Sequence, residues 1–236
     1  SIVAFGGRAL EKDQVPMYLD SPATAIYTKS RTLYGLNLSK GDLRKTGFAI
    51  VVEGYFDFAQ LYQAGGLPVV ATCGTALTTQ QAQMLRRFVP KVVINFDPDT
   101  AGQNAAERSS ELLVEAGFDV NVVRLPGGDD PDGFMQKHGR DRYLAELKRS
   151  QPYLEFLLER GASAHNLTRD DSRREFLQQM LAVAARIPDP ATRDQFADRL
   201  AHRARVTEEV VRAEIRKAAA ARKTTLPARF SPASTH

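Results

Sequence analysis

Cysteine, histidine and long apolar runs are all scarce in this sequence of 236 residues. Cys73 is the only cysteine, which excludes a disulfide within the chain and indicates a reducing compartment. The four histidines are scattered without the spacing of metal ligands, so we expect no zinc site: His138, His165, His202 and His236. No apolar run approaches the roughly 20 residues that a membrane-spanning helix needs. The composition is therefore that of an ordinary globular protein, with 43% hydrophobic and 25% charged residues.

Charge is distributed unevenly along the chain, whose formal net charge is +4. Residues 1–47 hold seven basic against four acidic residues (net +3), residues 48–150 hold ten against thirteen (−3), and residues 151–236 hold fifteen against eleven (+4). An acidic middle between basic segments suits a metal centre beside surfaces that bind phosphates. For the C-terminal excess taken alone, solvated helix faces are an equally good explanation.

The middle of the chain alternates between strand and helix patterns. Phe48–Val52 is a short apolar run rich in β-branched residues, typical of a strand that is buried on both faces. Similar runs follow at Leu67–Ala71, Val92–Phe96 and Val120–Leu125, and amphipathic segments separate them. This alternation predicts an α/β fold, with a parallel sheet flanked by helices and right-handed crossovers.

The segments on either side follow other patterns. Ile2–Phe5 and Met17–Leu19 are predicted as short strands. Beyond about Gly133 the strand signal disappears, and helical patterns predict a bundle: Tyr143–Leu147, Tyr153–Arg160, Ser172–Ile187, Thr192–Ala204 and Thr207–Ala221. We therefore expect four parts, the last a disordered tail poor in apolar residues: 1–46, 47–149, 150–222 and 223–236.

Three of the predicted strands are followed by carboxylates. Because the carboxyl ends of parallel strands meet at one edge of the sheet, where ligands bind, these side chains are expected to lie together: Glu53, Asp97, Asp99, Asp129, Asp130 and Asp132. A turn at Pro98 with a helix cap at Thr100 is expected to aim Asp97 and Asp99 at one site, and Asp57 is expected to cap a helix from Phe58. Oxygen ligands suit Mg²⁺ or Mn²⁺. Two ions ~3.5–4 Å apart would support metal-assisted phosphoryl or nucleotidyl transfer.

The same residues carry a family resemblance. Glu53-Gly-Tyr-Phe-Asp57, Asp97-x-Asp99-x-Ala-Gly102 and Asp130-Pro-Asp132 together resemble the Toprim module of bacterial replicative DNA primases of the DnaG type. Other blocks match that family in the same order, so the resemblance covers roughly residues 2–221: Phe5-Gly-Gly-Arg-Ala-Leu10, Tyr18-Leu-Asp-Ser-Pro22, Tyr34-Gly-Leu36 and Gly74-Thr-Ala-Leu-Thr78. The resemblance implies a Toprim-type parallel sheet, preceded by the remainder of a small α+β subdomain and followed by a helical bundle.

The resemblance also implies an activity and its residues. The expected activity is magnesium-dependent, template-directed synthesis of short RNA primers on single-stranded DNA, with Mg²⁺ or Mn²⁺ as cofactor and two ions expected. Glu53, Asp97 and Asp99 would be the catalytic metal ligands, and Asp130 and Asp132 would complete the acidic cluster. The remaining roles are a supporting carboxylate at Asp57, a solvated loop charge at Asp129, and a basic groove for template, nascent RNA or nucleotide: Arg8, Lys29 and Arg31. Ordinary surface charge is the alternative for each of these basic residues.

Two parts of such primases are expected to lie outside this sequence. One is the zinc-binding domain with the front of the catalytic domain, because no Cys and His ligands are supplied and a strand pattern opens the chain at Ile2. The other is the domain that contacts the replicative helicase. The resemblance further implies a cytoplasmic protein of the nucleoid-associated replication machinery, without a membrane partner.

Two other functions remain open at this point. Asp97-x-Asp99 also resembles the nucleophile loop of haloacid-dehalogenase phosphatases, but that family places the loop on its first strand, and Glu53 would be unexplained. The other is a non-catalytic module that binds nucleic acid or docks a helicase, which the basic flanks favour. Magnesium-dependent nucleotide incorporation would separate the polymerase from both.

Overall fold

The computed structural model describes residues 2–9, 15–16, 18–74 and 76–224, and divides into two compact units, Ser1–Pro152 and Tyr153–His236. The elements of the first unit are β1 (Gly6–Arg8), β2 (Tyr18–Asp20), η1 (Lys29–Arg31), α1 (Leu36–Thr46), β3 (Phe48–Val52), α2 (Tyr55–Gln63), β4 (Val69–Ala71), α3 (Thr79–Arg86), β5 (Lys91–Ile94), α4 (Thr100–Glu115), β6 (Asp119–Val122), η2 (Pro126–Gly128), α5 (Pro131–Lys148) and β7 (Gln151–Pro152). Within the described ranges, no helix is long and apolar enough to cross a membrane.

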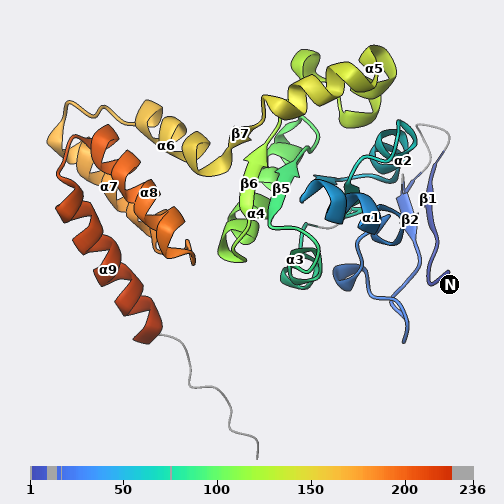
Figure 1. Ribbon diagram of the computed structural model, residues 1–236, viewed down its shortest axis with the longest axis horizontal. Coiled ribbons are helices and arrows are strands. Elements are labelled where there is room, and N and C mark those ends of the chain that lie inside the picture. Colours follow the sequence, from blue (N-terminus) through green and yellow to red (C-terminus); the bar gives the residue numbers. More distant parts are fainter. Residues whose placement is uncertain (1, 10–14, 17, 75, 225–236) are drawn as a thin grey trace, which may run out of the picture. The chain divides into compact units, whose positions relative to one another are not determined.

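A five-stranded sheet forms the centre of the first unit, and its strands β5, β6 and β7 are labelled in Figure 1. The strand order is β4-β3-β5-β6-β7. The first four strands are parallel and β7 is antiparallel to β6. The predicted parallel sheet is thus confirmed. The edge strand β7 was not predicted, because two residues that include a proline carry no strand pattern.

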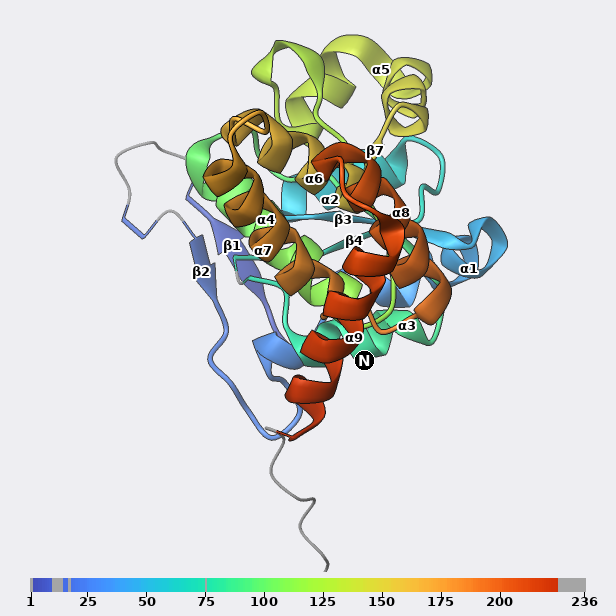
Figure 2. The ribbon, with the colours of Figure 1, turned by 90° about the vertical axis from the view of Figure 1, so that its left-hand side faces the viewer.

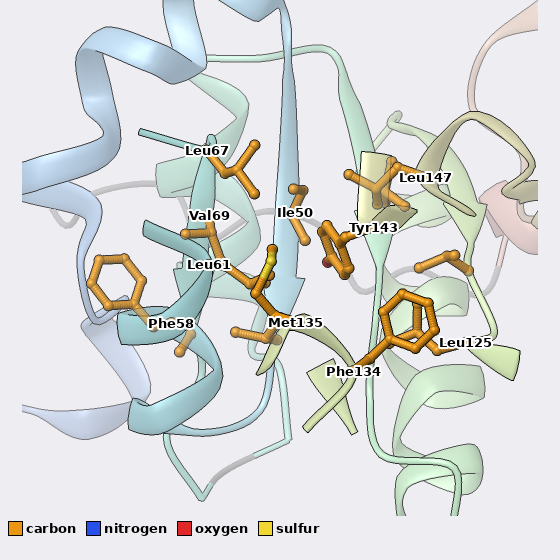
Figure 3. Packing of buried hydrophobic residues seen from close by; sticks show 14 of the residues in the cluster. Ile50, Phe58, Leu61, Leu67, Val69, Leu125, Phe134, Met135, Tyr143 and Leu147 are labelled. Carbon is orange, nitrogen blue, oxygen red and sulfur yellow. The ribbon is translucent and has the colours of Figure 1, made fainter. Parts of the chain in front are cut away.

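Helices cover both faces of this sheet. On one face, Ile50 and Val52 of β3 pack with Phe58 of α2 and with Phe134 and Tyr143 of α5 in a single buried cluster (Figure 3). Ala49 and Val51 alternate with these residues in β3, so they face the other side, and both are fully buried. On that side α4 contacts β5 and β6. Burial on both faces explains why β3 is a continuous apolar run.

Several predicted boundaries shift. The first strand is not Ile2–Phe5 but β1, whose exposed residues pair antiparallel with β2, with Arg8 opposite Tyr18. Pairing with β2 rather than apolar content specifies this strand. The predicted strand Val120–Leu125 corresponds to β6, which ends at Val122. Met17 and residues 225–236 of the predicted tail lie outside the described residues.

Two helices begin earlier than predicted. Helix α2 starts at Tyr55, and Asp57 is not its cap but its third residue, which accepts a hydrogen bond from Gly54 N (3.0 Å). The helix predicted at Tyr143–Leu147 is the end of the longer α5, which is broken at Gly139 (φ 75°, ψ 177°). Only glycine adopts that conformation readily. The break divides α5 into two helical pieces.

The second unit is helical: α6 (Tyr153–Ala164), α7 (Asp170–Ala184), α8 (Pro190–Ala204) and α9 (Glu208–Thr224). Helices α7, α8 and α9 contact one another (Figure 2). Phe176, Met180 and Ala184 recur along one face of α7 and are buried.

Candidate metal and nucleotide site

The carboxyl ends of β3 and β5 open into a pocket of about 460 Å³ in the first unit. Glu53 directly follows β3, and Asp97 lies three residues after β5. The loop before α5 brings further carboxylates to the same place. The pocket is lined by Arg8, Tyr18, Asp20, Lys29, Glu53, Gly54, Tyr55, Phe56, Asp57, Cys73, Gly74, Asp97, Asp130 and Asp132.

Glu53 and Asp97 are in direct contact. Glu53 Oε1 accepts a hydrogen bond from Asp97 N (3.3 Å). Gly102 of α4 makes this approach possible, because a Cβ atom there would lie 2.4 Å from Asp97 O and 3.0 Å from Glu53 Oε1. Burial, followed by the nearby charge of Asp97, raises the pKa of Glu53 to about 7. The pair therefore carries charge that a cation would stabilise.

Asp97 has an unsatisfied oxygen. Within the described part of the chain, its buried Oδ1 atom has no hydrogen-bond partner. Burial, followed by the charges of Asp130 and Asp99, raises the pKa of Asp97, whereas Arg8 lowers it. A buried carboxylate oxygen without a donor is costly unless a ligand or cation satisfies it.

Asp57 joins two of the acidic loops. Its Oδ2 accepts from Gly54 N (3.0 Å) beside Glu53, and its Oδ1 accepts from Asp132 N (3.2 Å) at the start of α5. Burial, followed by the charge of Asp97, raises the pKa of Asp57 to about 7. Asp57 thus holds the loop after β3 against the loop before α5.

Asp99 and Asp130 each cap a helix. Asp99 accepts from Gly102 N (2.7 Å) at the start of α4, and Asp130 accepts from Gly133 N (2.7 Å) at the start of α5. The cap predicted at Thr100 is therefore wrong, because the preceding residue takes that position. Asp99 does not line the pocket, although its charge contributes to the raised pKa of Glu53. The positive ends of two helix dipoles consequently lie at this edge of the sheet.

Asp129 is turned to a different partner. It pairs with Lys137 of α5 and does not line the pocket. Asp129 is therefore paired and not simply a solvated loop charge, and its exclusion from the metal ligands stays a prediction.

The pocket also has basic lining residues, Arg8 and Lys29, which we call the basic wall. Arg8 and Lys29 both line the pocket, whereas Arg31 is exposed and does not. Lys29 Nζ donates to Asp20 Oδ2 (2.5 Å), and Tyr55 Oη donates to Asp20 Oδ1 (2.5 Å). Asp20 therefore connects Lys29 of the basic wall with Tyr55, which lies two positions after Glu53.

Sequence reasoning did not assign Asp20 and Tyr55 to the site. Asp20 stands in Asp-Ser-Pro, which has the composition of a turn, and its partners are 9 and 35 residues away in the chain. Nor did the sequence indicate the buried hydrogen bond from Tyr143 Oη to Asn95 Oδ1 (2.8 Å), which supports the end of β5 two residues before Asp97. Only the fold brings these side chains together.

Cys73 lines the pocket but is a poor nucleophile. Burial raises the pKa of its thiol to about 12, so little thiolate exists at neutral pH. The chemistry of the pocket therefore depends on its carboxylates and on its basic residues, Arg8 and Lys29.

Three family models match the chain, each over a different part. Residues 1–40 match the N-terminal domain of the DNA primase catalytic core, residues 50–135 a Toprim-like family, and residues 154–209 the DnaB-helicase binding domain of primase. A DNA primase domain from Pseudomonas aeruginosa is 31% identical and superimposes with a TM-score of 0.82, covering 91% of this chain and 68% of that chain. The chain belongs to the bacterial DnaG-type DNA primases.

Other primases support this membership. The DNA primase of Clostridium acetobutylicum is 36% identical over 211 residues, which are 89% of this chain and 35% of the relative. A DnaG primase catalytic domain, solved bound to single-stranded DNA, is 31% identical with a TM-score of 0.81, and the match covers 88% of this chain and 67% of that chain. The chain thus spans about a third of the length of the curated primases it matches.

Membership in the primase family changes two of the sequence expectations. The helicase-binding match lies at residues 154–209, inside the chain, and not beyond its end as expected. The phosphatase alternative loses its support, because Asp97 follows β5, the third strand of the large sheet along the chain, and two of the three matched families are named for primases.

The Toprim-like match implies the use of a divalent metal. The unsatisfied Asp97 oxygen and the all-oxygen donor set fit such an ion. Among the described residues, no three His, Cys, Asp or Glu side chains form a ready-made metal site. The carboxylates of the pocket repel one another when no cation is bound. To bind a cation, their side chains would have to move closer together.

Proposed function

We propose that this chain supplies catalytic machinery for the synthesis of RNA primers on single-stranded DNA. The observation that carries the proposal is the pocket that Glu53 and Asp97 line together with Arg8 and Lys29. Nucleotidyl transfer needs a metal-binding acidic wall for the reacting phosphate and basic groups for the remaining phosphates.

Each wall of the pocket has a separate task in this proposal. Glu53, Asp97 and Asp99 are the catalytic carboxylates, and with Asp130 and Asp132 they hold Mg²⁺ or Mn²⁺, as two ions. The metal supplies charge stabilisation for the attacking and leaving oxygens. Asp57 supports the loops, and Lys29, oriented by Asp20, binds phosphate oxygens together with Arg8. Arg31, which is exposed beside Lys29, contacts the template or the nascent RNA.

The division of the chain follows the same proposal. Residues 1–46 form the remainder of the N-terminal catalytic subdomain, residues 47–149 the Toprim domain, and residues 150–222 the helical subdomain. Ribonucleoside triphosphates, the template strand and the nascent RNA are the ligands of the first two parts. The related DnaG catalytic domain that was solved with single-stranded DNA supports the template strand as a ligand.

Extension of a primer annealed to single-stranded DNA, with ribonucleoside triphosphates and Mg²⁺, tests the proposal. We expect incorporation by the chain to require the metal and to be lost in Glu53→Gln and Asp97→Asn, with Asp129→Asn retaining it. Incorporation that persists in either of the first two variants contradicts the assignment of the carboxylates.

The helical unit has a second candidate function, which the match at residues 154–209 favours. We propose that α6, α7 and α8 dock a replicative helicase. Co-sedimentation of the chain with a purified DnaB-type helicase, compared with the chain truncated after Pro152, tests this. Equal binding of both forms would assign the contact to the first unit.

A further inference from the structure

Arg8 lies over two aromatic rings that line the same pocket. Its Cζ atom is 5.6 Å from the centroid of the Tyr18 ring and 5.2 Å from that of the Phe56 ring. Arg8 and Tyr18 are paired across the β1–β2 ribbon, and Phe56 is the second residue of α2. Three elements, β1, β2 and α2, thus contribute to one cationic and aromatic surface, which we call the Arg8 platform (Arg8, Tyr18 and Phe56).

The core of the unit does not account for these rings. Tyr18 is 44% exposed and Phe56 is 49% exposed, whereas Phe58, two residues further along α2, is 3% exposed. A phenyl ring left half in water gives up much of its hydrophobic burial. Phe56 stands between Tyr55 and Asp57, and all three residues line the pocket.

We propose that the Arg8 platform stacks the nucleobase of the incoming nucleoside triphosphate. The inference rests on the proposed function, which places the triphosphate between the carboxylates and Lys29. A nucleobase is the flat, apolar-faced part of that ligand, and aromatic rings and guanidinium groups both stack on it. Stacking accepts every base, so we expect only a slight preference among the four nucleotides.

Calorimetric titration of this chain in Mn²⁺ tests the platform with two ligands, ATP and inorganic tripolyphosphate, which lacks the base. We expect Phe56→Leu to weaken ATP binding about tenfold and to leave tripolyphosphate binding unchanged. Phe56→Tyr should retain ATP binding. The matched control is Phe88→Leu, because Phe88 has Arg44 over its ring at 5.1 Å but does not line the pocket. It should change neither affinity.

The outcomes separate the platform from the proposed function. Unchanged ATP affinity in Phe56→Leu, or an equal loss for both ligands, overturns the platform while the metal and phosphate site remains. A loss confined to an oligodeoxynucleotide, titrated in parallel, would assign the platform to the template strand and overturn its role for the triphosphate. Failure of the unaltered chain to bind either triphosphate with Mn²⁺ would overturn the proposed function itself, and the inference with it.

Discussion

At the scale of single residues, the site is a set of carboxylates held closer than their charges favour. Glu53 and Asp97 share a hydrogen bond, Asp57 bridges two loops, and Asp97 Oδ1 is buried without a partner in the described part of the chain. A substitution that neutralises one carboxylate relieves repulsion and should raise the stability of the metal-free protein. The same substitution removes a metal ligand and should lower the affinity for the metal. Single substitutions therefore distinguish a metal site from a structural cluster.

The first prediction concerns metal affinity. Asp97→Asn should lower the affinity for Mn²⁺ about tenfold or more, because it removes a charged ligand, and should leave the metal-free fold intact or slightly more stable. Asp129→Asn is the matched control and should change the affinity little, because Asp129 pairs with Lys137 outside the pocket. Isothermal titration calorimetry of both variants gives the ranking. Equal affinities in the two variants would remove the metal site from this edge of the sheet.

The second prediction concerns pH. In the metal-free chain the pKa of Glu53 is raised from 4.5 to about 7, and that of Asp57 from 3.8 to about 7. The folded state therefore binds more protons than the unfolded state between about pH 4 and 7, so the free energy of unfolding should fall as pH rises through this window. Urea unfolding in EDTA measures this slope.

Two variants and a metal titration check this pH dependence. Glu53→Gln should flatten the fall in stability, whereas Glu115→Gln, at an exposed position of α4, should not. Affinity for Mn²⁺ should rise from about pH 6 to about pH 8, because the ligands must lose their protons to bind. A slope that is the same in Glu53→Gln as in the unaltered chain would place the titrating group elsewhere.

At the scale of elements, the start of α3 fixes the basic wall. Thr78 and Gln81 form a capping box, with Gln81 N donating to Thr78 Oγ1 (3.1 Å) and Thr78 N donating to Gln81 Oε1 (2.9 Å). The same two side chains also donate to the backbone around η1. Thr78 Oγ1 donates to Ser30 O (2.6 Å), and Gln81 Nε2 donates to Thr32 O (2.7 Å). One helix end thus also positions the turn that carries Lys29.

The third prediction tests this helix end. Thr78→Ala should lower the free energy of unfolding by about 1 kcal/mol or more, because it removes the cap and leaves Ser30 O without the hydroxyl donor. Thr78→Ser should keep most of the free energy of unfolding that Thr78→Ala loses. Thr79→Ala, at the neighbouring exposed position, should stay within about 0.5 kcal/mol of the unaltered chain. Comparable losses at both positions in urea unfolding would mean that the cap does not stabilise α3.

At the scale of the whole molecule, the three segments that differ in net charge correspond to the three family matches along the chain. The basic residues 1–47 overlap the primase N-terminal match, the acidic middle overlaps the Toprim-like match, and the basic C-terminal part overlaps the helicase-binding match. Phosphate contacts of a template strand are therefore expected mainly from the first part.

The fourth prediction follows from those phosphate contacts. Affinity for single-stranded DNA should fall linearly with salt on logarithmic axes, with a slope of about −0.7 per contacted phosphate. Arg31→Ala should reduce the slope by about that amount. Lys29→Ala should reduce it less, because the proposed function assigns Lys29, which pairs with Asp20, to the triphosphate. Lys91→Ala is the control, because Lys91 pairs with Asp119 at the amino ends of β5 and β6. Fluorescence anisotropy across salt concentrations measures the slopes, and an affinity that does not respond to salt would rule out binding through phosphates.

The sequence by itself determined the parallel sheet and the edge at which the carboxylates gather. A strand buried on both faces, such as Phe48–Val52, needs apolar residues at every position, and Glu53 follows this run immediately. Asp97 lies three residues after β5. The local sequence also determines the helix start at Thr78, because a capping box needs only two side chains three residues apart. These features depend on neighbours in the chain, which the sequence displays.

Tertiary structure alone decided which side chains meet across the pocket. It placed Asp20 between Lys29 and Tyr55, Phe56 under Arg8, and the bridge of Asp57 to the start of α5. It also moved the first strand to Gly6–Arg8, because pairing with β2 outweighs the apolar run before it. Each of these contacts joins residues 9 to 75 positions apart in the chain or depends on a partner strand, so no local pattern encodes it.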